Sequence, residues 1–85
     1  MNAPEPSPID FDELRRQARE VAQRAYSPYS SVQVGAALLG ANGQVFTGCN
    51  VENASYGATL CAERSALAHA VSSDVQSFVA LAIWA

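Results

Sequence analysis

The chain has 85 residues, of which 49% are hydrophobic and only 15% are charged, and its net charge is −3. This composition excludes a disordered chain and predicts one small domain with one core. Four of the five basic residues fall within residues 15–24, which leaves no basic face for a phosphate backbone, so we expect no nucleic-acid partner. Without an apolar run of roughly 18 residues or the pattern of a signal peptide, the sequence predicts a cytoplasmic protein with no membrane partner.

The first ordered element is predicted to be a helix that begins after Asp10. Three prolines within residues 1–8 predict a disordered tail over residues 1–9, followed by a single domain over residues 10–85. Asp10 can cap the helix, and Glu13 can reach back to complete a capping box. Apolar residues recur at spacings of three and four and form one stripe: Phe11, Leu14, Ala18, Val21, Ala22 and Ala25.

The next elements are predicted to be a hairpin, a second helix and a last strand. Residues 32–39 and 44–49 read as strands joined at Asn42-Gly43, which supplies the positive φ angles of a tight turn. Thr59 can cap the second helix, whose apolar stripe is Ala62, Ala66, Leu67, Ala70 and Val71. Residues 78–84 read as a buried strand, which the strand-helix-strand order makes parallel within the sheet. We therefore expect an α/β domain in the order α-β-β-α-β, with helices covering a mixed sheet.

The C-terminus of the predicted domain is unusual, because the chain ends on an apolar strand with no helix after it. An uncovered apolar edge invites pairing with another chain. The pattern points to truncation at Ala85.

The chemistry is concentrated at the start of the second helix. Cys61 lies where unpaired backbone N–H groups and the helix dipole favour a thiolate, the form that binds metal. Glu63 could carry protons beside a metal-activated hydroxide. The alternatives are that Cys61 is a packed small hydrophobe, that Glu63 is a first-turn carboxylate favoured by the dipole, and that Arg64 is a solvated cation.

Other candidate residues are less specific. Cys49 can be packed, can contribute to a metal site or can pair with Cys61, and the spacing does not decide between these. Asn50 and Glu52 point the same way along an extended segment, so they can bind a diol or cap a loop. His69 lies about 12 Å beyond Cys61 along the helix, too far to share a metal or to activate the thiol. A cysteine hydrolase is therefore the weakest option.

Three motifs give the chain a resemblance to a known family. Residues 25–30 read AYSPYS and are followed by VGAAL at 34–38; residues 48–53 read GCNVEN; and residues 61–64 read CAER. In this order and at this spacing, the chain resembles the small, homotetrameric type of zinc-dependent cytidine deaminase. The resemblance runs from about Phe11 to Trp84.

The resemblance implies a three-layer α-β-α fold and the hydrolytic deamination of cytidine or deoxycytidine, by a zinc-activated water, in pyrimidine salvage. It implies that Cys61 is a zinc ligand and that Glu63 is the catalytic proton shuttle. It also implies that Arg64 lies behind the zinc ligands, in the second layer of residues around the metal. The implied substrate-binding residues are Asn50, Glu52, Ala62, Tyr56 and Val32. The implied partners are a small-molecule nucleoside and further copies of the chain, as a homotetramer.

Two departures from the family pattern stand out. Val32 occupies a position where the family usually has an aromatic residue that stacks on the base. The family's second zinc motif, Pro-Cys-Gly-x-Cys, follows the third strand, and this chain stops at Ala85 before it. Because a catalytic zinc needs about three protein ligands, we expect the 85-residue chain alone to be inactive or nearly so. The alternatives are a catalytically dead fragment that survives as an oligomer-forming remnant, and a related deaminase of nucleoside antibiotics, against which residues 50–53 argue.

Overall fold

The computed structural model describes residues 9–52 and 60–85 of the chain. Its first element is the helix α1, Phe11–Ala22, with Asp10 as its N-cap: the Asp10 carboxylate accepts a hydrogen bond from the Glu13 N–H at 3.0 Å. The Glu13 side chain does not complete the expected capping box and accepts hydrogen bonds from Arg16 and Gln17 instead. Of the predicted tail, only Ile9 lies within the described residues.

The hairpin forms as predicted, with shorter strands. Strand β1, Gly35–Gly40, pairs antiparallel with β2, Val45–Cys49. At the turn only Gly43 has a positive φ, of 88°, and Asn42 accepts a hydrogen bond from the Gln44 N–H instead of adopting a left-handed conformation. The glycine alone therefore provides the backbone freedom that the turn requires.

The second helix and the last strand follow in the expected order, but the pairing of the strand differs from the prediction. Helix α2 is Ala62–Ser72 and strand β3 is Phe78–Trp84, and the sheet order is β2-β1-β3. Strands β2 and β3 run in the same direction, as a strand-helix-strand connection favours, but β1 lies between them. The last strand is thus parallel in direction to β2, as predicted, but both hydrogen-bonded pairings are antiparallel, so the prediction of a mixed sheet was wrong for the described residues.

Strand β3 is also less buried than predicted. It is an edge strand, and the exposed fractions of Val79, Leu81 and Ile83 are 55%, 44% and 49%. Its hydrophobic sequence correctly indicated a strand, but composition alone does not show whether a neighbour covers it.

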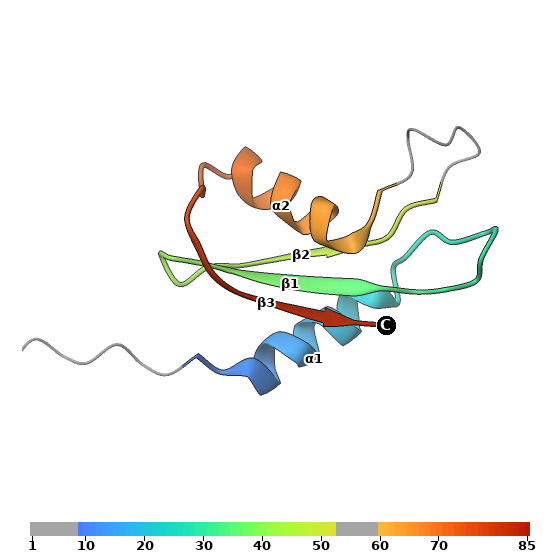
Figure 1. Ribbon diagram of the computed structural model, residues 1–85, viewed down its shortest axis with the longest axis horizontal. Helices are drawn as coiled ribbons and strands as arrows, with labels where there is room; N and C mark the ends of the chain where they lie inside the picture. Colours follow the sequence, from blue (N-terminus) through green and yellow to red (C-terminus); the bar gives the residue numbers. More distant parts are fainter. Residues whose placement is uncertain (1–8, 53–59) are drawn as a thin grey trace, which may run out of the picture.

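The domain has three layers, with α1 and α2 on opposite faces of the sheet (Figure 1). Alternating residues of β1 face the two helices: Ala36 and Leu38 pack with Phe46 and α2, whereas Ala37 packs with α1 and Ala82. This arrangement confirms the α-β-α architecture.

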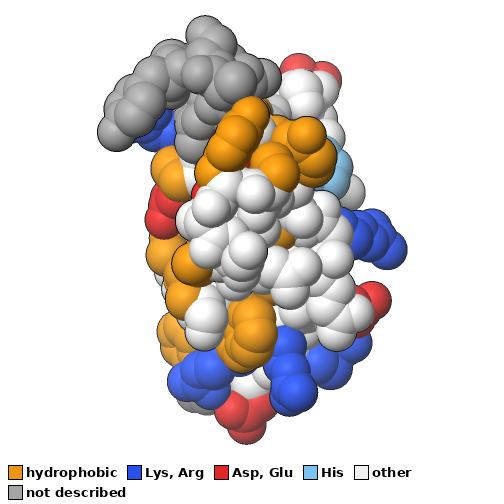
Figure 2. Space-filling view, turned by 90° about the vertical axis from the view of Figure 1, so that its right-hand side faces the viewer, with side chains coloured by type: hydrophobic (Ala, Val, Ile, Leu, Met, Phe, Trp, Pro, Cys, Tyr) orange, Lys and Arg blue, Asp and Glu red, His pale blue; other side chains and the backbone are white. Residues whose placement is uncertain are grey.

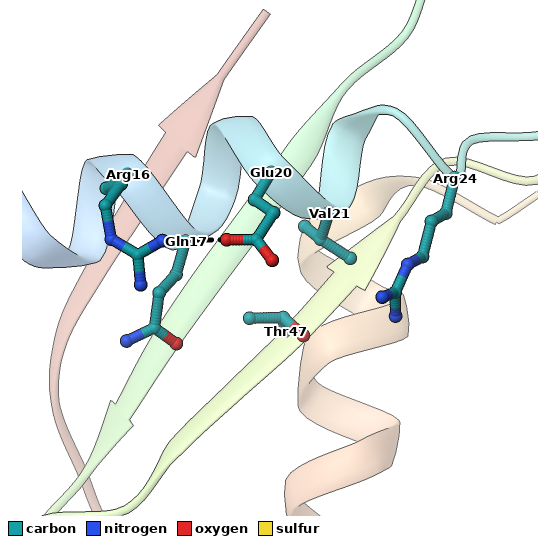
Figure 3. Close-up of a pocket in the computed structure, with 6 residues that line it drawn as sticks. All are labelled: Arg16, Gln17, Glu20, Val21, Arg24 and Thr47. Atoms are coloured by element: carbon teal, nitrogen blue, oxygen red, sulfur yellow. Dashed lines mark hydrogen bonds and ion pairs between the residues drawn. The ribbon is translucent and has the colours of Figure 1, made fainter.

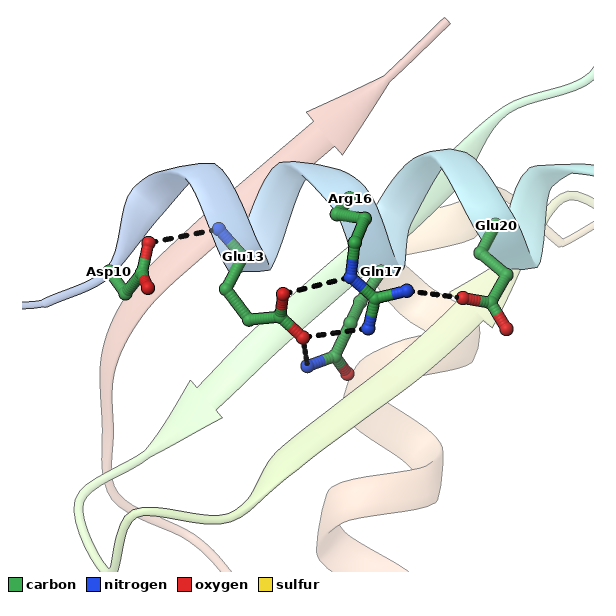
Figure 4. A network of polar contacts seen from close by, with 5 residues as sticks. All are labelled: Asp10, Glu13, Arg16, Gln17 and Glu20. Carbon is green, nitrogen blue, oxygen red and sulfur yellow. Dashed lines mark hydrogen bonds and ion pairs between the residues drawn. The ribbon is translucent and has the colours of Figure 1, made fainter.

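Charged side chains gather over α1. Arg16 bridges Glu13 and Glu20 at 2.7 Å each (Figure 4). Arg15 pairs with Asp12 at 2.8 Å. In the space-filling view the charges cluster at the α1 end, whereas hydrophobic side chains follow one flank (Figure 2). Among the described residues, no helix is long and apolar enough to cross a membrane.

Candidate functional site

The extended segment Asn50-Val51-Glu52 follows β2 and joins two other parts of the chain. Val51 exchanges two backbone hydrogen bonds with Leu60, at 2.9 and 2.8 Å, directly before the start of α2. On its other side, the Tyr26 N–H donates to the Asn50 carbonyl at 3.0 Å and the Glu52 N–H donates to the Tyr26 carbonyl at 2.7 Å. The segment therefore ties the loop after α1 to the residue that precedes Cys61.

The Asn50 side chain is buried, with 9% exposed, and it clamps the backbone before β1. Its Oδ1 accepts from the Val34 N–H and its Nδ2 donates to the Val32 carbonyl, both at 2.8 Å. Of the two uses predicted for Asn50, loop capping is the one that the structure contains. Among residues 9–52 and 60–85, these contacts use one lone pair and one N–H of the amide, which has two of each.

The Glu52 carboxylate caps the turn at residues 29–30. Its Oε1 accepts from the Tyr29 N–H at 3.0 Å and from the Ser30 N–H at 3.1 Å, and its Oε2 accepts from the Ser30 hydroxyl. These bonds, that of the hydroxyl foremost, hold the pKa of Glu52 below its usual value of 4.5 against the opposing effect of burial. Glu52 is therefore kept as a carboxylate at neutral pH.

Two other residues predicted to bind the nucleoside are Val32, near this segment, and Tyr56, outside the described residues. Val32 is 52% exposed, and both of its peptide groups are hydrogen-bonded, its N–H to the Ser30 hydroxyl and its carbonyl to Asn50. Tyr56 and the predicted cap Thr59 lie outside the described residues.

Cys61 lies at the N-terminus of α2, as predicted, and is itself the N-cap. Its side chain is exposed and free, which contradicts the alternative of a packed small hydrophobe. The neighbouring Cys61 thiol, the Glu63 N–H and the charge of Arg64 lower the pKa of Glu63. Ala62, between them, is buried against the sheet, and as the first helical residue its N–H has no acceptor within the helix. The four residues of this motif therefore meet at one helix end.

The metal-binding capacity of this end is limited. No group of three His, Cys, Asp or Glu side chains that could hold a metal occurs within residues 9–52 and 60–85. Cys49 is half-buried and, like Cys61, is not in a disulfide. A catalytic zinc needs about three protein ligands, so the donor set described here is insufficient for one, although an exposed thiol at a helix start fits the role of a single ligand.

His69 is not part of the site. Its ring lies edge-on to Phe46, with centroids 5.3 Å apart, and its Nδ1 lies 3.3 Å from the Thr47 carbonyl oxygen. The structure thus confirms that His69 is a surface histidine with a local partner.

Ser30, which lies in the first motif, is a further residue of this segment that local sequence does not predict. Its hydroxyl contacts both Glu52 and the Val32 N–H. A serine two residues after a proline ordinarily indicates only a turn, and no local pattern shows that its partner lies 22 residues away.

A groove of about 170 Å³ lies elsewhere, between α1 and β2 (Figure 3). It contains none of the predicted nucleoside residues, and its Arg16 is paired with Glu20. It is lined by Arg16, Gln17, Glu20, Val21, Arg24 and Thr47.

Comparison with known proteins agrees with the fold and the motifs. Residues 10–83 match the model of the cytidine and deoxycytidylate deaminase zinc-binding region. A cytidine deaminase of Sporosarcina psychrophila is 47% identical over 75 residues, which cover 88% of this chain and 55% of that protein. A cytidine deaminase of Halalkalibacterium halodurans is 49% identical over 75 residues, covering 88% and 57%. The chain therefore belongs to the cytidine and deoxycytidylate deaminase family.

Solved structures support the same fold. The crystal structure of cytidine deaminase from Mycobacterium tuberculosis superposes with a TM-score of 0.86 at 47% identity, over 89% of this chain and 62% of that one. That of Burkholderia pseudomallei gives 0.84 at 45% identity, over 88% and 61%. The chain spans little more than half the length of the curated relatives named above.

Proposed function

We propose that this chain supplies the nucleoside-binding side and one zinc ligand of an enzyme that hydrolyses cytidine or deoxycytidine to the corresponding uridine and ammonia. The observation that carries the proposal is the position of the exposed Cys61 thiol at the N-terminus of α2, two residues before Glu63, whose pKa the thiol lowers. The cytidine deaminases to which the chain is similar, at 47% and 49% identity, support the substrate class.

Each residue has a proposed part that its position permits. Cys61 would be a zinc ligand; when bound, the metal would supply an activated water. Glu63, a carboxylate at neutral pH, would accept a proton and deliver it to the ring nitrogen of the base. The Ala62 N–H would bind the base carbonyl, and Arg64 would offset negative charge around the metal.

The nucleoside side of the site is proposed to be Asn50 and Glu52 for the ribose, and Val32 for the base. Tyr56 would reach a neighbouring site. The hydrogen-bonding capacity of the Asn50 amide supports this role, because its contacts within the described part of the chain, to Val32 and Val34, use one donor and one acceptor of two each.

The function can be tested with a chimera in which residues 10–83 replace the matching region of the Sporosarcina psychrophila relative. We expect the chimera to convert cytidine to uridine, and Glu63→Gln to reduce kcat about a hundredfold or more because the proton carrier is lost. Glu20→Gln, on the outer face of α1, is the matched control and should retain the activity. A folded chimera that binds zinc and does not deaminate cytidine would contradict the proposal.

The 85-residue chain alone is proposed to be inactive or nearly so, because its described residues offer too few metal ligands. The measurements are zinc per chain and ammonia release from cytidine. Stoichiometric zinc together with a normal rate would refute this part of the proposal.

We further propose a cytoplasmic homo-oligomer, a tetramer in the complete protein, that acts in pyrimidine salvage. The exposed apolar residues of the edge strand β3 support self-association. If the chain proves to be a catalytically dead remnant, oligomer formation without nucleoside binding is the expected behaviour.

A further inference from the structure

One hydroxyl connects two residues of the proposed nucleoside site. The Ser30 hydroxyl donates its proton to Oε2 of Glu52 and accepts the Val32 N–H at 3.1 Å. Glu52 stands on the proposed ribose side and Val32 on the proposed base side. A substitution that removes the Ser30 hydroxyl therefore removes a contact to Glu52 and a contact to Val32 together.

The surrounding contacts make this link stiff. Oε1 of Glu52 is held by the N–H groups of Tyr29 and Ser30, so the hydroxyl on Oε2 fixes the remaining rotation of the carboxylate. The Val32 carbonyl is held by the Asn50 amide at 2.8 Å, so the Ser30 hydroxyl fixes the other end of this residue. Without the hydroxyl, the Glu52 carboxylate would be held through Oε1 alone and the Val32 backbone through its carbonyl alone.

We propose that Ser30 is a positioning residue of the nucleoside site, whose hydroxyl sets the Glu52 carboxylate and the Val32 backbone relative to each other. This inference rests on the proposed function, because it presumes that Glu52 contacts the ribose. Ser30 itself makes no contact with the substrate in this proposal. A hydroxyl is suited to the role because it donates and accepts at the same time.

The test uses the 85-residue chain with Ser30→Ala, and with Ser30→Thr as the conservative variant. The probes are cytidine and 2′,3′-dideoxycytidine, which lacks the hydroxyls that Glu52 would bind, and affinities are measured by calorimetry. We expect Ser30→Ala to lower the preference for cytidine about fivefold or more, as the loss of a hydrogen bond to a charged group does, and Ser30→Thr to restore it. Ser31→Ala removes the hydroxyl next to it, and this control should keep the preference.

A second measurement separates this proposal from the proposed function. Carbon NMR follows the titration of the Glu52 carboxyl, and proton NMR follows the Val32 amide. In Ser30→Ala, both signals should change together, with the Glu52 titration moving toward higher pH, and Ser30→Thr should resemble the parent chain.

The outcomes are distinct. If the parent chain shows no preference for cytidine, the ribose role of Glu52 is contradicted, while the NMR signals still decide whether Ser30 couples the two groups. If the parent shows the preference and Ser30→Ala keeps it, the positioning role is overturned. Unchanged NMR signals of Glu52 and Val32 in Ser30→Ala overturn it as well.

Discussion

At the scale of single residues, the Asn50 side chain holds the fold together next to the proposed site. Its amide accepts from the Val34 N–H and donates to the Val32 carbonyl just before β1, and the Asn50 backbone N–H donates to the Val34 carbonyl at 3.2 Å. The side chain and the backbone of Asn50 thus both hold the segment before β1, and Val32 remains exposed.

Replacing Asn50 with Ala should lower the free energy of unfolding by about 1–3 kcal/mol, because the Val34 N–H and the Val32 carbonyl lose a buried partner. Urea unfolding followed by circular dichroism measures the change. The matched control is Asn42→Ala at the exposed hairpin turn, which should cost less than half as much. Equal losses in the two variants would contradict the clamp.

Two carboxylates make stability depend on pH in the acid range. The Arg16 guanidinium lowers the pKa of Glu13 to about 2, and the Ser30 hydroxyl and N–H lower the pKa of Glu52 below 4.5. Since both pKa values are lower in the folded chain, these groups contribute stability fully above about pH 4.5, and the contribution is lost as the pH falls toward about 2.

The free energy of unfolding should therefore decrease from about pH 5 to about pH 2, and Glu13→Gln and Glu52→Gln should each make the decrease shallower. Thermal unfolding at a series of pH values provides the measurement. In about 1 M salt the contribution of Glu13 should shrink, since its Arg16 partner is exposed, while that of Glu52, held by uncharged donors, should persist. If the free energy of unfolding depends on pH equally in the parent chain and in both variants, Glu13 and Glu52 are not the source of the pH dependence.

At the scale of elements, two glycines bring the helices onto the sheet. A Cβ at Gly35 would lie 1.8 Å from the Ala18 carbonyl oxygen of α1, and one at Gly48 would lie 2.3 Å from the Ala66 nitrogen of α2. In both cases the obstacle is backbone, which cannot turn aside as a side chain can. The helices and the sheet are therefore in direct backbone contact.

Gly48→Ala should destabilise the chain by about 1–3 kcal/mol or more, because α2 must move away from β2. The control is Gly43→Asn, at a position with open space and a left-handed φ that asparagine tolerates, and it should have a small effect. Thermal unfolding of both variants gives the comparison. A Gly48→Ala chain as stable as the Gly43→Asn chain would contradict the close contact.

At the scale of the whole molecule, the edge strand β3 leaves an apolar flank, part of which is visible in Figure 2. Its outward side chains alternate with inward ones, as in a strand with one covered face. Residues 78–84 contain neither a charged residue nor a proline, the features that usually keep an edge strand from pairing with another chain.

We expect the chain to self-associate, and the double change Val79→Thr with Leu81→Thr to weaken the association at least severalfold because it removes apolar contact area. The mass in solution, from light scattering over a range of concentrations, measures the effect. Phe11→Ser, equally exposed at the start of α1, should leave the mass unchanged. A monomeric parent chain would contradict the expectation.

Much of the fold could be predicted from local pattern. The cap at Asp10, the glycine of the hairpin turn, the 78–84 strand and the position of Cys61 at a helix start all depend on neighbours a few residues away, and the structure confirms each of them. The helix of residues 11–22 was predicted to extend further because Ala25 fits its stripe. Tyr26, however, pairs with Val51, and α1 ends at Ala22.

The sequence by itself determined the order of the elements, the motifs and the family, because these follow from periodicity and spacing along the chain. Only the tertiary structure decided the antiparallel pairing of β3 with β1, the exposure of its outer face, and the contacts of Asn50, Glu52 and Ser30. These depend on which distant segments become neighbours. A hydrogen bond between residues 22 positions apart has no signature in either local sequence.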